Sequence, residues 1–424
     1  MTLALIFTNK ATFAAQMNSN LRFHRNLVFA TIDSLHLIFN EDKQADKVLK
    51  QTLKRDKRWG ARDRGFIAET SYDIVRWIRL YAKIADVKSP YKREDLFRVF
   101  AVWAVLKGHT LPNWPQFEGT PERRIRGRYD ELSKERVYRE SIPDWLDAMG
   151  LEQLGGQWEA ELKALNQQAQ VVLRANTLKT DKRRLKDALE DSDIYTNEHP
   201  NCPDALVLKE RTNVFTLPIF KEGWFEVQDI SSQQVGELLD VKPGMRVVDA
   251  CAGAGGKTLH LAALMQNKGQ IIATDIYDFK LTELKRRARR AGAHNVETRF
   301  IDSPKVYKKL YGSADRVLID APCSGLGVLK RNPDSKWKLS PEFMQEIQKT
   351  QAEILERYSK MVKAGGKLVY ATCSILPAEN QEQVARFLES EAGAEFTVEE
   401  EKSLWPSKTG FDGFYMCLLS KSKA

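Results

Sequence analysis

The carboxyl-terminal half of the chain alternates short β-branched runs with helical stretches, and no other feature restricts the fold as strongly. After Val241 the runs are MRVVDA, QIIATD, ADRVLIDA and GKLVYATC. Strands that alternate with helices form a parallel sheet with helices on both faces. We therefore predict an α/β domain built on a mostly parallel sheet.

Each run closes on a polar or reactive side chain, namely Asp249, Asp275, Asp320 and Cys373. Ligands of parallel α/β sheets bind where the carboxyl ends of the strands emerge. With the usual strand order, ADRVLIDA lies beside both MRVVDA and GKLVYATC. Asp320, Cys323 and Cys373 are then expected to open onto one crevice.

The segment VVDACAGAGGKTLHLA, residues 247–262, reads as a strand, a turn of small residues and the start of a helix. Glycines allow a ligand close to the backbone, and free N–H groups at a helix start attract an anionic group. One candidate is a phosphate-binding P-loop, G-x-x-x-x-G-K-T, but its first glycine would fall on Cys251. VLIDA fits the metal-binding strand of such an enzyme, so this alternative stays open.

A dinucleotide or S-adenosylmethionine fits the same segment better. Asp275 ends the second strand 26 residues beyond Asp249, where a carboxylate can accept both ribose hydroxyl protons. S-adenosylmethionine would place its methionine carboxylate near the turn. The alternative role for Asp275 is to cap the helix that follows it.

The five cysteines, Cys202, Cys251, Cys323, Cys373 and Cys417, show no C-x-x-C and no paired spacing. Such a pattern fits neither a zinc site nor a disulfide framework, so we expect no metal and a reducing, cytoplasmic location. A single buried cysteine usually serves as a small apolar side chain. Two at adjacent strand ends, beside a carboxylate and a cofactor loop, indicate covalent chemistry.

Methylation of cytosine at carbon 5 suits a site of this kind. Carbon 5 is a poor nucleophile until a thiolate adds at carbon 6 of the ring. A carboxyl group such as that of Asp320 assists by protonating or hydrogen-bonding N3. One thiol attacks, and the second can assist release of the product.

The charge of the chain favours a polyanionic partner. Lys and Arg number 66 against 57 Asp and Glu, and dense basic patches with interleaved aromatics stand at 54–64, 123–128, 285–290 and 305–311. Such patches pair with phosphates and stack on bases, which favours nucleic acid. The apolar run Leu3–Phe7 is too short for a signal peptide or a membrane span, so we expect no membrane association. Met17 is an alternative start to Met1.

The amino-terminal half has a different texture. Between about Leu21 and Glu140, apolar residues recur at intervals of three and four, which predicts a compact helical module. A short helical connector follows. VVLRAN, DKRRLKDALED and ALVLKE then predict a small module of mixed α and β structure.

The combination DACAGAGGKT, an Asp at the next strand end, LIDAPCSGLGVLKRNPDSKW and LVYATCSILPAENQEQV resembles the NOP/Sun family of RNA cytosine-5 methyltransferases. RNLVFATIDSL and DRGFIAETSYDIVRW are similar to the NusB-like helical domain of its bacterial small-subunit rRNA branch. LRANTLKT and FEVQDISSQQVGELL are similar to its RRM-like module and the lead-in to the sheet. The resemblance implies a NusB-like RNA-binding domain at 21–140, an RRM-like module at 141–235 and a Rossmann-like methyltransferase domain at 236–424, after a leader at 1–20.

The resemblance also implies roles for individual residues. Cys373 of TCS would be the nucleophile, Cys323 of PCS would assist release, and Asp320 would lie against the cytosine and the methionine end of the cofactor. Asp275 would bind the ribose and Asp302 the adenine. The turn would hold S-adenosylmethionine through Cys251, Ala252, Gly253, Ala254, Gly255, Gly256 and Lys257. Three cations would contact RNA, namely Lys330, Arg331 and again Lys257.

Two departures from the family pattern affect this assignment. The family usually has Ala and then Pro where this chain has Gly253 and Ala254, and Asp302 lies in FIDSP rather than after a glycine. We expect a monomeric, S-adenosylmethionine-dependent RNA cytosine-5 methyltransferase that acts on 16S rRNA. The alternatives are the same chemistry on tRNA, a P-loop-type NTPase and a non-catalytic RNA-binding assembly factor.

Overall fold

The computed structural model of the protein describes residues 22–423, so the leader expected at 1–20 and the choice between Met1 and Met17 lie outside the described residues. The chain divides into two compact units. The helical unit comprises the described residues up to Gln168 together with Glu210–Asn213 and Leu329–Leu339. The sheet unit comprises Ala169–Lys209, Val214–Val328 and the chain from Ser340 onward. These two units do not coincide with the three domains predicted from the sequence, whose boundaries near residues 140 and 235 stay a prediction.

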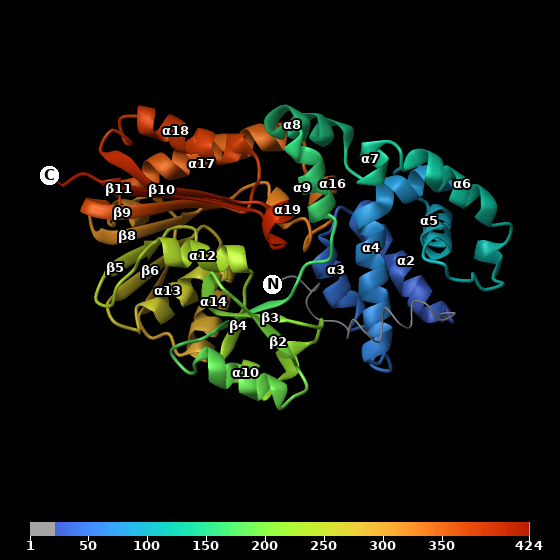
Figure 1. Cartoon of the computed structure of the whole chain (residues 1–424), viewed down its shortest axis with the longest axis horizontal. Helices are drawn as coiled ribbons and strands as arrows, with labels where there is room; N and C mark the ends of the chain where they lie inside the picture. Colours follow the sequence, from blue (N-terminus) through green and yellow to red (C-terminus); the bar gives the residue numbers. More distant parts are fainter. Residues whose placement is uncertain (1–21, 424) are drawn as a thin grey trace. The chain divides into compact units, whose positions relative to one another are not determined.

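The helical unit confirms the helical periodicity of the amino-terminal half. Its core packs large apolar side chains that are fully buried, among them Ile32, Leu35, Ile67 and Phe100. The elements are α2 (Arg25–Phe39), α3 (Ala45–Thr52), α4 (Ala61–Ala85), α5 (Arg93–Leu106), η2 (Pro115–Phe117), α6 (Glu122–Leu132), α7 (Arg136–Arg139), α8 (Asp144–Leu154), α9 (Gln157–Leu165) and α16 (Ser335–Lys338) (Figure 1).

The segment Leu329–Leu339 belongs to the helical unit although its neighbours in sequence belong to the sheet unit. Asp334 accepts a hydrogen bond from the Ala45 amide at 3.0 Å. The Trp337 indole donates to the Val75 carbonyl at 2.7 Å, and Arg76 donates to the Lys330 carbonyl at 2.9 Å. These bonds satisfy backbone groups on both sides, which fixes the segment on the helices.

The small module has mixed α and β structure, as its sequence texture predicts, and its sheet has four antiparallel strands in the order β2-β3-β1-β4. Glu226 of β4 is 2% exposed. Its carboxylate accepts a hydrogen bond from Arg287 at 2.8 Å and forms a salt bridge with Arg290, and these contacts connect the module to α14 within the same unit. The elements are β1 (Val172–Ala175), α10 (Lys182–Glu190), β2 (Thr196–His199), β3 (Cys202–Leu208), η3 (Val214–Thr216), α11 (Pro218–Lys221), β4 (Phe225–Val227) and α12 (Ile230–Leu238).

The large sheet has the order β10-β11-β9-β8-β5-β6-β7, and the five strands from β9 to β7 run parallel. This confirms the α/β prediction and the position of β8 between β5 and β9. The elements are β5 (Arg246–Asp249), α13 (Gly256–Leu264), β6 (Gln270–Asp275), α14 (Asp278–Ala291), β7 (Val296–Phe300), α15 (Pro304–Lys308), β8 (Ala314–Asp320), η4 (Leu326–Val328), α17 (Pro341–Ser359), β9 (Val362–Thr372), η5 (Pro377–Glu379), α18 (Gln381–Glu389), β10 (Phe396–Leu404), α19 (Pro406–Thr409) and β11 (Phe414–Lys421).

Helices cover both faces of this sheet. Val247 and Ile271 point to the face that packs on α13 and α14, while their neighbours Val248 and Ile272 point to the face that packs on α17. Figure 1 shows α17 and α18 on one side of the strands and α13 and α14 on the other. Alternate residues of the same apolar strands therefore contribute to the hydrophobic cores on the two faces of the sheet, as expected for buried parallel strands. No helix within the described residues is long and apolar enough to cross a bilayer.

Candidate active site

The carboxyl ends of the parallel strands carry the predicted side chains. Asp249, Asp275 and Asp320 are the last residues of β5, β6 and β8, and Cys373 directly follows the end of β9. Because β8 pairs with both β5 and β9, the ends of these three strands are adjacent. The strand ends that were expected to border one crevice are thus neighbours in one sheet.

The two cysteines at adjacent strand ends are in contact. Cys323 Sγ and Cys373 Sγ are 3.3 Å apart, and each residue is partly exposed. The hydrogen bond with Cys373 and burial of the thiol raise the pKa of Cys323 well above its ordinary value. Cys323 is therefore held as a neutral thiol beside the sulfur of Cys373.

Lys257 points into the same site. Its Nζ donates to Asp320 Oδ2 at 2.7 Å and lies 5.1 Å from the centre of the Phe414 ring. The Lys257 side chain is only 11% exposed. A lysine at the start of a helix could simply face solvent, but here a salt bridge and an aromatic ring hold the ammonium group.

The glycine-rich turn between β5 and α13 has two residues in the left-handed region, which favours glycine. Gly253 and Gly255 have φ of 53° and 85°. A Cβ on Gly255 would lie 2.5 Å from Leu284 Cγ, whereas one on Gly253 or Gly256 would meet no atom within 4 Å. The turn is thus tightly packed on one side and borders open space on the other, as a ligand-binding turn requires.

Asp275 is bonded to this turn. Its Oδ2 accepts from the Gly253 amide at 2.9 Å, and its Oδ1 accepts from the Tyr277 amide at 2.9 Å. The N-cap of α14 is Tyr277, so Asp275 is not the capping residue of that helix. Its carboxylate is oriented by two amides at the edge of the turn.

The match to known families follows these motifs. A family model described as 16S rRNA methyltransferase RsmB/F matches residues 237–420, and a RsmF/B-like ferredoxin-like domain matches residues 142–215. Ribosomal RNA small subunit methyltransferase B of Yersinia pseudotuberculosis is 34% identical over 334 residues, which is 76% of this chain and 77% of that protein. The chain belongs to the RsmB/F family of rRNA methyltransferases. The NOP/Sun resemblance is thereby confirmed.

Other relatives support the same family and fold. A Synechocystis relative is 39% identical over 254 residues, which is 59% of this chain and 56% of the relative. The crystal structure of PH0851 has a TM-score of 0.81 at 27% identity and covers 95% of this chain and 100% of its own. The structure of NSun6 from Pyrococcus horikoshii with SFG has a TM-score of 0.62 at 21% identity, covering 68% of this chain and 100% of its own, and this likeness concerns the fold.

RsmB/F-family methyltransferases use S-adenosylmethionine, so the predicted cofactor is confirmed at the level of the family. The residues present here fit that group. Open space borders Gly253 and Gly256, and the Asp249 Oδ1 atom is buried without a hydrogen-bond partner. An unpaired buried carboxylate oxygen marks a place where a donor is wanted. Family membership favours this cofactor over the nucleotide of a P-loop NTPase.

Two buried groups at the turn, Asp249 and Cys251, have raised pKa values. Burial raises the pKa of Asp249 to about 7, although the Thr258 hydroxyl donates to its Oδ2 at 2.7 Å and opposes the shift. Burial also raises the pKa of the Cys251 thiol well above its ordinary value. Perturbed groups of this kind concentrate at functional sites.

Three predicted contact residues belong to other segments of the chain. Asp302 is exposed two residues after the end of β7, at the carboxyl edge beside β6. Lys330 and Arg331 lie in the helical-unit segment Leu329–Leu339, and the Lys330 side chain is 3% exposed. The adenine role of Asp302 and the RNA contacts of Lys330 and Arg331 stay predictions.

Sequence reasoning missed a group of buried polar residues behind the cysteines. Glu379, which is fully buried, accepts hydrogen bonds from Ser324, Ser374 and Gln351. The two serines directly follow the two cysteines. The repeated Cys-Ser pair was the one signal in the sequence that could have drawn attention to them.

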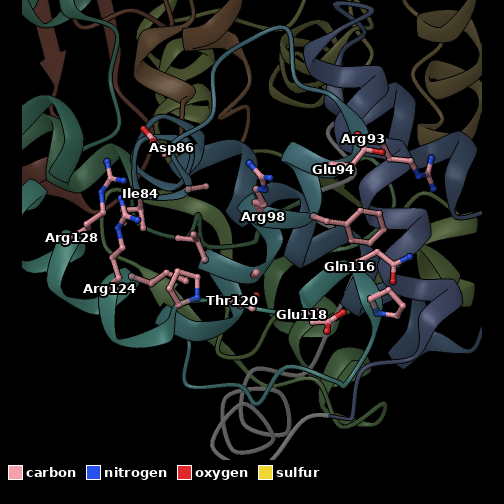
Figure 2. A pocket seen from close by; sticks show the side chains of 18 of the residues that line it. Ile84, Asp86, Arg93, Glu94, Arg98, Gln116, Glu118, Thr120, Arg124 and Arg128 are labelled. Carbon is pink, nitrogen blue, oxygen red and sulfur yellow. The ribbon is translucent and has the colours of Figure 1, made fainter.

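The helical unit carries a pocket of about 670 Å³ between α5, η2 and α6. Its apolar lining includes Phe97 and Ile125. Its charged lining includes Arg98, Arg124 and Arg128, which are labelled in Figure 2. Arg124 and Arg128 are one turn apart on α6, within the basic patch 123–128 noted in the sequence. Acidic residues, Asp86, Glu94 and Glu118, also border the pocket.

Proposed function

We propose that the chain methylates carbon 5 of a cytosine in 16S rRNA through a covalent adduct between Cys373 and carbon 6 of the base. The observation that carries the proposal is the 3.3 Å contact between Cys323 and Cys373, at strand ends beside Asp320 and the cofactor turn. Methyl transfer to a ring nitrogen or a hydroxyl needs no thiol nucleophile. A pair of thiols in a methyltransferase site therefore favours carbon 5 of a pyrimidine.

S-adenosylmethionine supplies an electrophilic methyl group to this site. The turn Cys251–Lys257 and the carboxylate of Asp275 would hold it, the latter through the ribose hydroxyls. Both oxygens of Asp275 are already oriented by backbone amides. The site therefore needs little reorganisation to bind the cofactor.

The addition step assigns a role to each of three residues. The Cys373 sulfur, as thiolate, forms a bond to carbon 6, and the electron pair displaced from the ring makes carbon 5 nucleophilic. The Lys257 and Asp320 pair, joined at 2.7 Å, can deliver a proton to N3 as negative charge develops there. Asp320 thus contacts the base, and Lys257 keeps the pair supplied with a proton.

Release requires loss of the proton on carbon 5 and rupture of the bond between Cys373 and carbon 6. Cys323 is held as a thiol in contact with Cys373. It can pass its proton to the departing sulfur and receive the proton from carbon 5, so that no net charge accumulates. N3 returns its proton to Asp320 as the aromatic ring is restored.

We propose further that the helical-unit pocket binds an unpaired stretch of the rRNA. Arg98, Arg124 and Arg128 would contact phosphates, and the apolar lining would receive a base. The net charge of +9 supports a polyanionic substrate. A cytosine must also leave its stack to reach the thiols, which is easiest in a loop or an unpaired segment.

Methyl transfer to purified RNA tests the proposed function. The protein is incubated with labelled S-adenosylmethionine and small-subunit rRNA from a strain that lacks the corresponding gene, and bisulfite sequencing then locates the modified base. We expect one cytosine in 16S rRNA to be modified, and Cys373→Ala to abolish turnover while binding of the cofactor is retained. Cys417→Ala, which removes a fully buried cysteine of β11, is the matched control.

Two outcomes would contradict the proposal. Full activity of Cys373→Ala would show that the nucleophile is misassigned. Methylation confined to tRNA, with 16S rRNA unmodified, would retain the chemistry but reject the substrate.

A further inference from the structure

We infer that Glu379 is a positioning residue that holds the two cysteine thiols against each other. The inference rests on the proposed function, since it concerns the pair of thiols that this function uses. Glu379 lies at the end of η5, six residues after Cys373, and is 0% exposed. It touches neither sulfur through a hydrogen bond, so its action is exerted through the backbone next to each cysteine.

The carboxylate joins the residues that follow the two cysteines. Oε1 accepts from the hydroxyls of Ser324 and Ser374, each at 2.5 Å, and Oε2 accepts from the Ser324 amide at 2.8 Å. Ser324 follows Cys323 and Ser374 follows Cys373. A single side chain therefore clamps together two loops that are 50 residues apart in the sequence.

A glutamine extends the clamp to the other side of Cys323. Gln351 of α17 donates from Nε2 to Glu379 Oε2 at 3.0 Å and to the carbonyl of Pro322 at 2.9 Å. Pro322 and Ser324 flank Cys323, so the backbone on both sides of this thiol is tied to one network. The position of Cys323 relative to β9 is thereby fixed.

The loop after Cys373 is held in a similar way. Asn380 accepts from the Thr372 hydroxyl at 2.5 Å and donates to the Ser374 carbonyl at 3.1 Å, so both neighbours of Cys373 are anchored. The Tyr370 hydroxyl donates to the Glu379 carbonyl at 2.8 Å. The clamp is thus built into β9 and is carried by the rigid sheet.

A carboxylate is suited to this place because it accepts hydrogen bonds only. Its two oxygens offer about four acceptor positions, which match the four donors around it. A buried carboxylate is costly unless such donors surround it. If Ser324 and Ser374 served only to fill space, no carboxylate would be needed between them. The observed hydrogen bonds instead require one acceptor that reaches both cysteine loops.

Positioning at this level matters for the reaction. A nucleophile displaced by about 1 Å can lose on the order of 100-fold in rate. The proton exchange between Cys323 and Cys373 requires the 3.3 Å contact, and the clamp acts on the residues directly beside both thiols. Loss of Glu379 should therefore separate the thiols and slow turnover while leaving the cofactor turn in place.

The test compares Glu379→Ala and Glu379→Gln with the wild type. We expect Glu379→Ala to lower kcat about 100-fold with little change in the KM for RNA or in S-adenosylmethionine binding. Glu379→Gln can still accept from the Ser324 amide and from Gln351, while the serine hydroxyls rotate to accept from its amide, so it should recover most of the activity. Phe387→Leu in α18, a buried change outside the clamp, is the control for lost stability.

A second readout measures the thiol contact without any activity. An aromatic disulfide oxidises Cys323 and Cys373 to an internal disulfide with loss of two hydrogens, which mass spectrometry counts. We expect this disulfide to form about tenfold more slowly in Glu379→Ala than in the wild type or in Phe387→Leu. Should Glu379→Ala fail to fold, Ser324→Ala with Ser374→Ala carries the same expectation.

The proposal is overturned if the clamp variants form the disulfide at the wild-type rate, or if Glu379→Ala loses activity only as much as Phe387→Leu. Because the disulfide readout needs neither RNA nor cofactor, it separates this inference from the proposed function. Inactive wild-type protein with a fast disulfide would reject the function and keep the clamp.

Discussion

Asp249 shows how burial sets the protonation of a single residue in this site. Its carboxyl group is 1% exposed, accepts from Thr258 and lies in the field of Asp320, Asp275 and Lys257. Its pKa is raised to about 7, chiefly by burial. In the cofactor-free protein at neutral pH, the Asp249 carboxyl group at the end of β5 is therefore partly ionised while buried, which lowers the stability of the folded state.

Asp249→Asn should change the pH dependence of stability. Between about pH 4 and pH 7 the folded wild type binds more protons than the unfolded chain, so this group lowers the free energy of unfolding as pH rises through that window. Asparagine has no such dependence and can still accept from Thr258. Relative to wild type, the variant should gain about 2.5 kcal/mol of stability between pH 5 and pH 8.

Urea unfolding of the cofactor-free protein at pH 5 and pH 8 measures this difference. Asp315→Asn, which alters an acid whose pKa is lowered by Lys363 and the Arg246 amide, is the contrasting control. An Asp249→Asn variant with the same pH profile as the wild type would show that Asp249 is not protonated in the folded state near neutral pH.

At the residue scale, the sequence identified those site residues that stand at the carboxyl ends of strands. Asp249, Asp275, Asp320 and Cys373 were found because each terminates an apolar run, and their placement required only the strand order. Glu379 was missed because it lies in a short loop helix, ILPAEN, where nothing marks a buried acid. Its role depends on tertiary contacts with Ser324 and Gln351, which no local pattern encodes.

The elements around the site must approach one another closely. The Gly327 amide in η4 donates to the Cys373 carbonyl at 2.9 Å, and its carbonyl accepts from the Gly413 amide at 2.8 Å. A Cβ on Gly327 would lie 2.1 Å from the Gly413 carbonyl oxygen and 2.8 Å from that of Cys373. The turn after Cys323 therefore reaches β9 and the start of β11 only because residue 327 has no side chain.

Gly327→Ala should separate these elements. We expect a loss of about 1–3 kcal/mol in the free energy of unfolding, as for other overpacked sites, and a larger loss of methyl transfer than the stability change explains. Gly127→Ala in α6, where a Cβ meets no atom within 4 Å, is the control and should be neutral or stabilising. Unchanged stability and activity of Gly327→Ala would refute the close approach.

Some strands of the large sheet could be predicted from the sequence and others could not, because they differ in burial. The runs of β5, β6, β8 and β9 are central, apolar and β-branched, so their sequence alone identifies them. In β7 and β10 most side chains are partly or fully exposed, and VETRF and FTVEEEKSL show no apolar run. The antiparallel strand β11 lies after the last predicted strand and was not recognised, so the sheet is larger than expected.

At the scale of the whole molecule, charge and pocket geometry lead to a prediction about RNA. Arg124→Ala with Arg128→Ala removes two guanidinium groups from the helical-unit pocket. We expect weaker binding of a 16S rRNA fragment, and the slope of log K against log salt should fall by about 1.4 if two phosphate contacts are lost. Filter binding across a salt series measures both quantities.

The matched control is Lys47→Ala with Lys50→Ala, which removes two exposed cations from α3 of the same unit. An equal loss of affinity in both double variants would point to general attraction by net charge. Unchanged affinity and slope for the pocket variant would exclude these arginines from the RNA contact.

The central claim is that Cys373 bonds to the cytosine and that Cys323 acts only in release, and the most direct measurement is the covalent complex itself. Cys323→Ala, incubated with S-adenosylmethionine and substrate RNA, should accumulate a protein–RNA band that survives denaturing electrophoresis. Adding Cys373→Ala to the same variant should remove that band. A band that persists without Cys373, or no band in Cys323→Ala despite measurable methyl transfer, would contradict the account.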